Sequence, residues 1–392
     1  MKVAILYYRL FDADGREQMI GGVETYLLNL GALCAEIGWE PTLFQCSNRP
    51  FERAIGDLKV VGVPVPKTSP SSNWTSFPWA RHKRRNQALF EAATKSVDLS
   101  KDLLIFGADH HSVPTNSRRC IAIQHGVDWD LPSRFHTKKM LCKSGWGARL
   151  KKATLIYAAI KSFENCPNRV CVDYNFLNWY RTLLPAEPAG RIWVIPNFAL
   201  VASPDQVHAR EEAPGVVRVL FARRFTEYRG TRIMAEAAKR ILRMNKDVEF
   251  TFAGEGPDEE WLQRHFAGEQ RVTFTKFLPP DTIRVHLKYH IAVVPSLASE
   301  GTSFSVAEAM AAGCAVVATA VGGITNMILD GYNGLLVMPD AASLAAGLER
   351  LVADAPLRAR LGRTAYETAV GAFNLDRWKA KWREVLEKVA NG

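Results

Sequence analysis

Short runs of β-branched, aliphatic and aromatic residues alternate along the chain with longer segments in which apolar residues recur at helical spacing. The first run covers residues 2–8, and a glycine-containing loop and a helical pattern that ends near Gly38 follow it. Further runs predict buried strands at residues 41–46, 59–65, 102–108 and 120–126. Because strands that alternate with helices usually build a parallel sheet, the first half is predicted to be an α/β unit.

The alternation is interrupted after residues 191–198, where a stretch rich in Pro, Glu and Ala runs to Gly215. It resumes with predicted strands at residues 216–222, 248–254, 271–277, 290–296, 314–319 and 334–338. This repetition predicts an α/β fold of two Rossmann-like, doubly wound lobes that face a central cleft. We divide the chain into a first lobe (1–198), a second lobe (199–374) and a closing helical pattern (375–392).

Composition narrows the class of protein. The chain has 392 residues, 47% of them apolar, and no run approaches the ~20 apolar residues that span a bilayer. Its seven cysteines show neither zinc-site spacing nor a disulfide framework. No carboxylate pair or His/Cys cluster has the spacing of a metal site. These features favour a cytoplasmic protein that needs no metal.

The net charge of +10 suits nucleic acid, a membrane surface or anionic substrates. Residues 134–161 contain no acid and hold Trp146 among many cations, a composition that suits a surface resting on anionic headgroups. A solvated basic face accounts for the same pattern. The cations are Arg134, Lys138, Lys139, Lys143, Arg149, Lys151, Lys152 and Lys161.

Two carboxylates flank the predicted start of a helix in residues 295–319. Glu300 lies in a loop, and Glu308 lies about one turn into a helix that stops at Gly313. Backbone N–H groups at a helix start lack partners and sit at the positive end of the helix dipole, so a diphosphate fits there. A capping box from Ser305 to Glu308 would explain Glu308 without a ligand, but it leaves Glu300 unexplained.

Glu300, seven intervening residues and Glu308, followed by AMAAGCAVVAT and VGGITNMILDGYNGLLV, resemble the donor signature of the family 4 retaining glycosyltransferases. The resemblance covers most of the second half and implies the GT-B architecture. It implies that Glu300 contacts the hydroxyls of the donor sugar and Glu308 the ribose. The phosphates would meet the loop and helix start at Gly301, Thr302, Ser303, Phe304 and Ser305.

Two arginines after the first strand of the second lobe resemble the cationic element of the same family. The resemblance implies that Arg224 and Arg229 grip the diphosphate, with Arg223 as the competitor of Arg224. Preorganised cations stabilise the negative charge that grows on a departing diphosphate. Ordinary surface arginines are the alternative.

Further positions match the family less closely. Gly254 lies in a glycine motif that lines the nucleotide side of the cleft in the family. Lys276 replaces the family's usual glycine before Phe277, which leaves the expected contact of Phe277 with the base in question.

In the first half, Gly21 and Gly22 resemble the family's glycine loop, which implies a close approach of the backbone to phosphate or acceptor. His125 follows a predicted strand, where an open α/β sheet holds its ligands, and it resembles the family's histidine that faces the transferred sugar. A plain loop before a helix and a structural histidine are the respective alternatives. The family also implies that the closing helix returns to the first lobe.

The function expected from these residues is metal-independent, retaining transfer of a hexose from a UDP- or GDP-linked sugar, which serves as co-substrate with no further cofactor. A glycan or lipid-linked acceptor in cell-envelope polysaccharide or lipopolysaccharide synthesis fits the basic first half, at the inner face of the plasma membrane and without nucleic acid. The alternatives are an inactive binding protein of the same fold, or a sugar-nucleotide epimerase or phosphorylase. Neither lobe has the GxGxxG pattern of a nicotinamide-dependent oxidoreductase.

Overall fold

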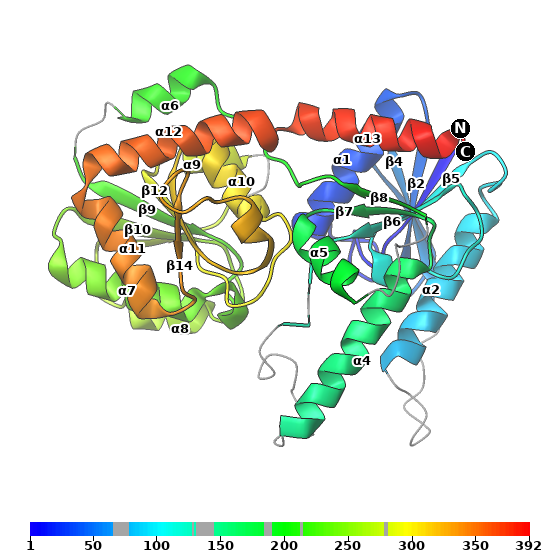
Figure 1. The fold of residues 1–392 in the computed structure, drawn as a ribbon, viewed down its shortest axis with the longest axis horizontal. Helices are drawn as coiled ribbons and strands as arrows, with labels where there is room; N and C mark the ends of the chain where they lie inside the picture. Colours follow the sequence, from blue (N-terminus) through cyan, green and yellow to red (C-terminus); the bar gives the residue numbers. More distant parts are fainter. Residues whose placement is uncertain (66–77, 128, 131–144, 184–189, 212–214, 278–280) are drawn as a thin grey trace.

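The computed structural model describes residues 1–65, 78–127, 129–130, 145–183, 190–211, 215–277 and 281–392, which form two lobes side by side (Figure 1). Each lobe is built on one sheet with helices on both faces. The first sheet has eight strands in the order β3-β4-β2-β1-β5-β6-β7-β8, and the second has six in the order β11-β10-β9-β12-β13-β14. The predicted α/β class with two doubly wound lobes is confirmed.

The strands of the first lobe are parallel except β3, which pairs antiparallel with β4 through a short hairpin and departs from the expected all-parallel alternation. The strands are β1 (Lys2–Leu6), β2 (Glu40–Ser47), β3 (Phe51–Ile55), β4 (Leu58–Pro64), β5 (Leu103–Phe106), β6 (Cys120–Gln124), β7 (Asn168–Cys171) and β8 (Arg191–Val194). The helices are α1 (Gly22–Glu36), α2 (Pro78–Thr94), η1 (Asp109–His111), α4 (Gly145–Glu164) and α5 (Tyr174–Thr182).

The second lobe is wholly parallel in its sheet. Its strands are β9 (Val217–Ala222), β10 (Val248–Ala253), β11 (Val272–Thr275), β12 (Ile291–Val294), β13 (Ala315–Thr319) and β14 (Leu335–Val337). The helices from here to the end of the chain are α6 (Pro204–Glu211), η2 (Glu227–Arg229), α7 (Thr231–Met244), α8 (Glu259–His265), α9 (Thr282–His286), α10 (Phe304–Ala311), η4 (Gly322–Asn326), α11 (Ala341–Ala353), α12 (Ala355–Ala372) and α13 (Leu375–Ala390).

Successive side chains of each central strand point to opposite faces of its sheet and pack in two different hydrophobic clusters. In β1, Val3 and Ile5 pack with α1 and α13, whereas Ala4 and Leu6 pack with α2 on the opposite face. In β12, Ile291 and Val293 join the cluster of α7 and α11, and the intervening residues join the cluster of α10 and α12. Apolar burial on both faces explains why these strands read as continuous apolar runs.

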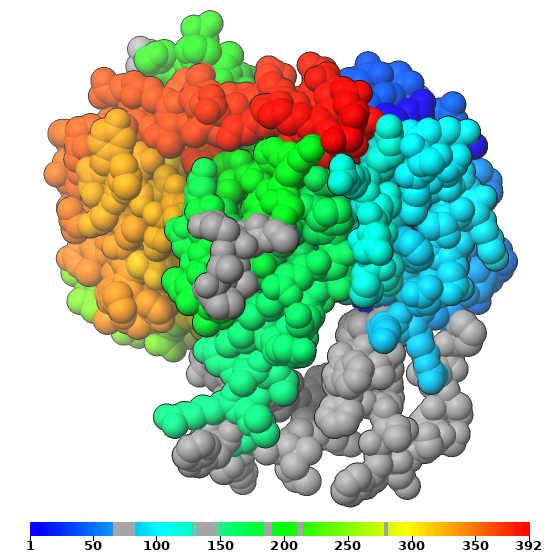
Figure 2. All heavy atoms as spheres, turned by 45° about the vertical axis from the view of Figure 1, so that its right-hand side comes forward, coloured from blue at the N-terminus to red at the C-terminus, as the bar shows by residue number. Residues whose placement is uncertain are grey.

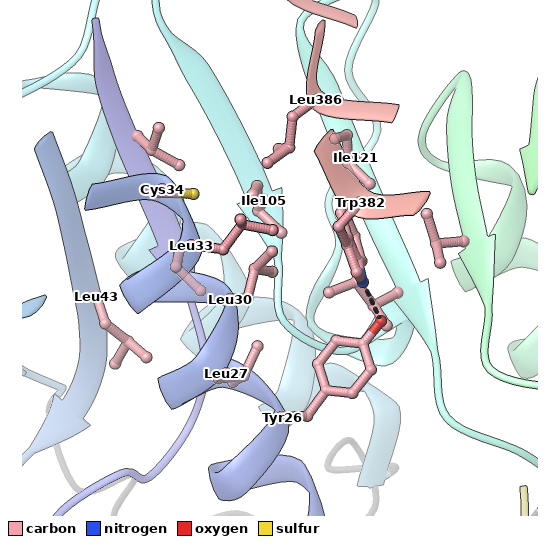
Figure 3. Close-up of a cluster of buried hydrophobic side chains, with 14 of the residues drawn as sticks. Tyr26, Leu27, Leu30, Leu33, Cys34, Leu43, Ile105, Ile121, Trp382 and Leu386 are labelled. Atoms are coloured by element: carbon pink, nitrogen blue, oxygen red, sulfur yellow. Dashed lines mark hydrogen bonds between the residues drawn. The ribbon is translucent and has the colours of Figure 1, made fainter. Parts of the chain in front are cut away.

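The final helix packs on the first lobe although it follows the second lobe in the chain. Helices α12 and α13 run along one side of both lobes (Figures 1 and 2). Trp378 and Trp382 of α13 are buried in the same cluster as Tyr26 of α1, and the Trp382 Nε1–H donates to the Tyr26 hydroxyl at 2.8 Å (Figure 3). The two connections between the lobes lie together, because the amide of Ala199 donates to the carbonyl of Phe373 at 2.7 Å.

Candidate donor and acceptor site between the lobes

A buried carboxylate and two guanidinium groups meet where the strand order of the second sheet reverses. Arg223 directly follows β9, and Ser296 follows β12, the two strands at this switch point. The Arg223 Nη1–H donates to the Ser296 hydroxyl at 2.5 Å, and both residues bond the carboxylate of Glu300. Arg229 of η2 reaches the same carboxylate with Nη1 at 2.7 Å. The three charged groups sum to one positive charge, which favours an anionic ligand.

The burial of this cluster decides its electrostatics. The side chains of Arg223 and Glu300 are 4% and 10% exposed, whereas that of Arg229 is 35% exposed. Burial alone would raise the pKa of Glu300, but the adjacent Arg223 and Arg229 hold it well below its usual range. Glu300 is therefore a carboxylate at any physiological pH, and Arg229 is the member that faces outward.

Arg223, the competitor of Arg224, is the arginine that lies in this cluster. Arg224 is exposed, whereas Arg223 turns inward to Ser296 and Glu300. Successive residues of an extended chain point to opposite sides, so only one of two neighbouring arginines can enter the site. Gly254 lies against this turn: its φ is 154°, and a Cβ there would come within 2.0 Å of the Arg223 carbonyl oxygen. The glycine allows the backbone of Arg223 to approach the end of β10.

Helix α10 begins directly behind Glu300. Its N-cap is Ser303, with φ −74° and ψ 120°, so Glu308 lies beyond the first turn. The capping box at Ser305, the alternative explanation of Glu308, is not formed. Burial raises the pKa of Glu308 to about 8, while Arg223 acts in the opposite direction. Glu308 thus holds a proton more readily than an ordinary glutamate, and a protonated carboxyl group can both donate to and accept from a hydroxyl.

The loop between Gly301 and Ser305 is more occupied than the sequence suggested. The amide of Ser303 donates to the sulfur of Met327, and the hydroxyl of Thr302 donates to the carbonyl of Val172 in the first lobe. The start of α10 at Phe304 still presents the amides that a helix cannot satisfy internally. Within the expected run of free amides, that of Ser303 is therefore already bonded.

The first lobe contributes His125 from the end of β6. Its Nε2 lies 2.7 Å from the carbonyl oxygen of Gly107, and its ring meets Tyr26 edge-on at 5.2 Å. Burial lowers the pKa of His125 to about 4, so the ring is neutral near pH 7. Because a carbonyl only accepts, Nε2 carries the proton and Nδ1 is the acceptor that a sugar hydroxyl could use.

The glycine loop of the first lobe lies against the start of α10. A Cβ on Gly22 would stand 3.1 Å from the ring of Phe304, and one on Gly21 would stand 2.3 Å from Oε2 of Glu24. The hydroxyl of Tyr7, after β1, donates to Oε1 of Glu24 at 2.9 Å. These residues bring the carboxyl ends of β1 and β6 to residues 299–305 of the second lobe (the Glu300 loop).

The two lobes are in direct contact around Glu300. The amide of Ser299 donates to Asp130 of the first lobe at 2.8 Å, and Asn197 donates to the Thr302 carbonyl at 2.6 Å. A Cβ on Gly301 would come within 2.6 Å of the His125 carbonyl oxygen. The sequence did not single out Asp130, Asn197 or Ser296, because none of them stands in a motif and only the fold brings them to Glu300.

Residues 216–354 match the family model for Glycosyl transferases group 1. The match covers most of the second lobe. Among curated proteins, the chain is 33% identical over 210 residues to a D-inositol 3-phosphate glycosyltransferase of Acidothermus cellulolyticus (48% of this chain, 46% of that protein). It is 31% identical over 190 residues to the lipopolysaccharide core biosynthesis glycosyltransferase LpsE of Rhizobium meliloti (47% and 54%). The chain spans about half the length of these curated relatives.

Solved structures match over the whole length of the chain. Sucrose-phosphate synthase of Thermosynechococcus elongatus aligns with a TM-score of 0.73 and 19% identity over 99% of this chain and 98% of that one. WaaG, a glycosyltransferase involved in lipopolysaccharide biosynthesis, aligns with a TM-score of 0.70 and 15% identity over 98% and 99%. The two lobes therefore have the GT-B fold.

Two of the expected positions follow β11, the strand at one edge of the second sheet. The Phe277 ring lies 6.4 Å from that of His286, edge to face. Lys276, which replaces the usual glycine, pairs with Glu255 at 3.2 Å and is exposed. Among the described residues, no group of three or more His, Cys, Asp or Glu side chains is arranged to hold a metal ion.

Proposed function

We propose that the chain is a glycosyltransferase that moves a sugar from a nucleotide diphosphate donor to an acceptor held by the first lobe. The observation that carries the proposal is the Arg223–Glu300–Arg229 cluster directly in front of the start of α10. Two cations and a helix N-terminus at a sheet switch point form an anion site, and a sugar diphosphate is an anion with hydroxyls at its far end.

Each residue then has a role in the transfer. Arg223 and Arg229 stabilise the charge that grows on the leaving diphosphate, which such preorganised cations do without a metal. Glu300 bonds these arginines and accepts from hydroxyls of the donor sugar. Glu308 bonds the ribose, and Phe277 and Gly254 border the base side.

We infer a retaining reaction on the front face of the sugar. The acceptor attacks from the side that the diphosphate leaves, and a phosphate oxygen takes its proton. Among the described residues, Glu300 is the carboxylate near the sugar position, and its ion pairs make it a poor nucleophile because they stabilise its charge. Neutral His125 positions the sugar through Nδ1.

The acceptor and its location are inferred from the first lobe. Helix α4 projects away from the first sheet (Figures 1 and 2) and carries Leu150 and Tyr157, which are 69% and 63% exposed, near the exposed Lys152. The basic residues 134–144 lie outside the described residues. No described helix is long and apolar enough to cross a membrane. We propose a glycan or lipid-linked acceptor of envelope or lipopolysaccharide synthesis, reached from the cytoplasmic face of an anionic membrane, and we expect no nucleic-acid partner.

The donor class is tested by thermal unfolding with UDP, GDP, ADP, CMP or no ligand. A ligand at 100 times its Kd stabilises the native state by about 2.7 kcal/mol, which is several degrees. A shift with UDP or GDP is expected, and it should be lost in Glu308→Ala but kept in Glu367→Ala, an exposed helical glutamate of α12. No shift with any nucleotide would favour a binding protein that kept the fold.

Transfer itself is tested with a radiolabelled nucleotide sugar. Free nucleoside diphosphate should appear only when an acceptor is present, which separates a transferase from an epimerase, and it should do so without inorganic phosphate, which separates it from a phosphorylase. The reaction should persist in excess chelator. Activity that is lost with chelator and restored by magnesium would contradict the role given to Arg223 and Arg229.

A further inference from the structure

A buried carboxylate of the first lobe has no counter-charge beside it. It faces the Glu300 loop of the second lobe (residues 299–305), which is the proposed donor loop. Asp173 is the N-cap of α5, where Oδ1 accepts from the amide of Phe176 at 3.2 Å. The residue is 2% exposed, and its Oδ2 accepts no hydrogen bond from the described part of the chain. A helix cap needs only one carboxylate oxygen, so the second oxygen is left for the interface.

Gly323 of η4 separates this oxygen from the Glu300 loop. A Cβ on Gly323 would lie 2.3 Å from Oδ2 of Asp173 and 2.7 Å from the carbonyl oxygen of Gly301. The amide of Gly323 donates to the carbonyl of Glu300 at 2.7 Å. The carboxyl group of Asp173 thus meets the segment that holds the backbone of Glu300 and Gly301, and any change in its volume or hydration acts on that backbone.

The surroundings of Asp173 contain little that could balance its charge. The titratable side chain that interacts with it is the thiol of Cys171 on β7, whose own pKa burial also raises. Helix η4 has no ionisable side chain, and on the donor loop Glu300 is bound by Arg223 and Arg229. On α5, Tyr174 is the next residue and Arg181 lies in the last turn. Burial raises the pKa of Asp173 to about 6.

We propose that Asp173 is a positioning residue that sets how closely the first lobe shuts on the Glu300 loop: the neutral carboxyl group favours the closed arrangement, and the carboxylate favours opening. Closure takes the group out of water, which penalises its charged form, and opening returns it to water. A protonated Oδ2 is also a donor, and a backbone carbonyl at the interface can accept from it. The inference rests on the proposed function only in taking the Glu300 loop as the donor site.

The direction of the pH dependence follows from the raised pKa. Closure is most favoured below the ordinary value of 3.8, and this advantage is lost as the pH rises through about 6. Each unit of pKa difference between the open and closed states corresponds to tenfold in the closure equilibrium. The difference between 3.8 and about 6 therefore allows a change of up to about 100-fold.

Hydrogen exchange of the donor loop tests the proposal without any ligand. The amides of Ser299 and Gly323 donate across or beside the interface, so their peptides report closure. In the wild type, protection of these peptides, corrected for intrinsic exchange, should fall between pH 4.5 and pH 7.5. Asp173→Asn keeps an equally good helix cap and removes the charge. This variant should be protected tenfold or more above the wild type at pH 7.5, with no pH dependence.

Two further variants control the experiment. Asp340→Asn makes the same change at an exposed N-cap, that of α11, and should exchange like the wild type. Gly323→Ala adds a methyl group against Asp173 and should lower the protection and weaken nucleotide binding. Near-ultraviolet circular dichroism checks that each variant is folded.

Two outcomes would overturn the proposal. One is that the protection of the Ser299 and Gly323 peptides from exchange in the wild type does not change with pH. This measurement needs no variant. The other is folded Asp173→Asn that exchanges like the wild type at pH 7.5. Failure of the proposed function is seen separately, as wild-type protein that binds no nucleotide in a calorimeter while its loop protection still depends on pH.

Discussion

The two lobes share one architecture but contribute to the site in different ways. The second lobe supplies charged side chains from two short segments: Arg223 and Arg229 follow β9, and Glu300 lies between β12 and α10. The first lobe supplies backbone carbonyls, such as that of Val172, and single polar side chains from distant segments. Charged side chains gathered in short segments leave a local signature in the sequence, whereas contacts assembled by the topology of the fold do not.

The largest effect should come from a substitution in α13, the helix that follows the second lobe in the chain but packs on the first. Trp382→Ala removes a fully buried indole from the first lobe although residue 382 follows the second lobe in the chain. The loss of packing should destabilise the first lobe by about 3 to 5 kcal/mol. Differential scanning calorimetry should show one transition move down while a second stays in place.

Trp382→Phe is the matched control for that experiment. It keeps an aromatic ring but loses the hydrogen bond to Tyr26, which is worth about 1 kcal/mol, and part of the buried volume, so it should destabilise the first lobe less than Trp382→Ala does. A single transition that shifts as a whole would mean that the lobes unfold together and that α13 couples them.

The next test compares two neighbouring arginines of the second lobe, of which Arg223 is buried and Arg224 is exposed. Arg223→Ala removes a buried partner of Glu300 and should lower kcat by about 100- to 1000-fold, the usual cost of losing one preorganised donor. Arg224→Ala changes an exposed side chain and should leave kcat within about twofold. Steady-state kinetics with a labelled donor decides between them, and equal losses in both variants would return Arg224 to the site.

The sequence predicted more of the second lobe than of the first. The strands and the two carboxylates of the second lobe were predictable because apolar runs and the spacing of Glu300 and Glu308 are local patterns. Which arginine turns inward was not, because that depends on the rotation of the chain after β9. Strands β3 and β7 were missed: β3 has an exposed face of charged residues, and β7 is four residues long. Asp130 and Asp173 meet the donor loop only after the lobes are folded.

A smaller effect should separate the two carboxylates of the second lobe. Burial raises the pKa of Glu308 to about 8, from 4.5, so its contribution to stability is complete below pH 4.5 and is lost as the pH rises through 8. In urea unfolding, the stability of the wild type relative to Glu308→Gln should therefore fall by about 3 to 4 kcal/mol between pH 5 and pH 8. The comparison with the variant cancels the titration of Asp173 and His125, which both proteins share. Glu300, whose pKa is held low by Arg223 and Arg229, should contribute nothing to the slope in this range.

The smallest effect concerns the exposed surface of α4 in the first lobe. If α4 rests on anionic headgroups, Lys152→Gln should weaken binding to phosphatidylglycerol-containing vesicles about fivefold, since one lysine near such a surface is worth about 1 kcal/mol. Lys95→Gln, an exposed lysine just beyond α2, is the matched control and should bind like the wild type. Binding should also fall with added salt, because the attraction is screened within a Debye length. Equal binding of both variants would assign α4 to solvent, and the basic charge of the first lobe would then serve an anionic acceptor instead of a membrane.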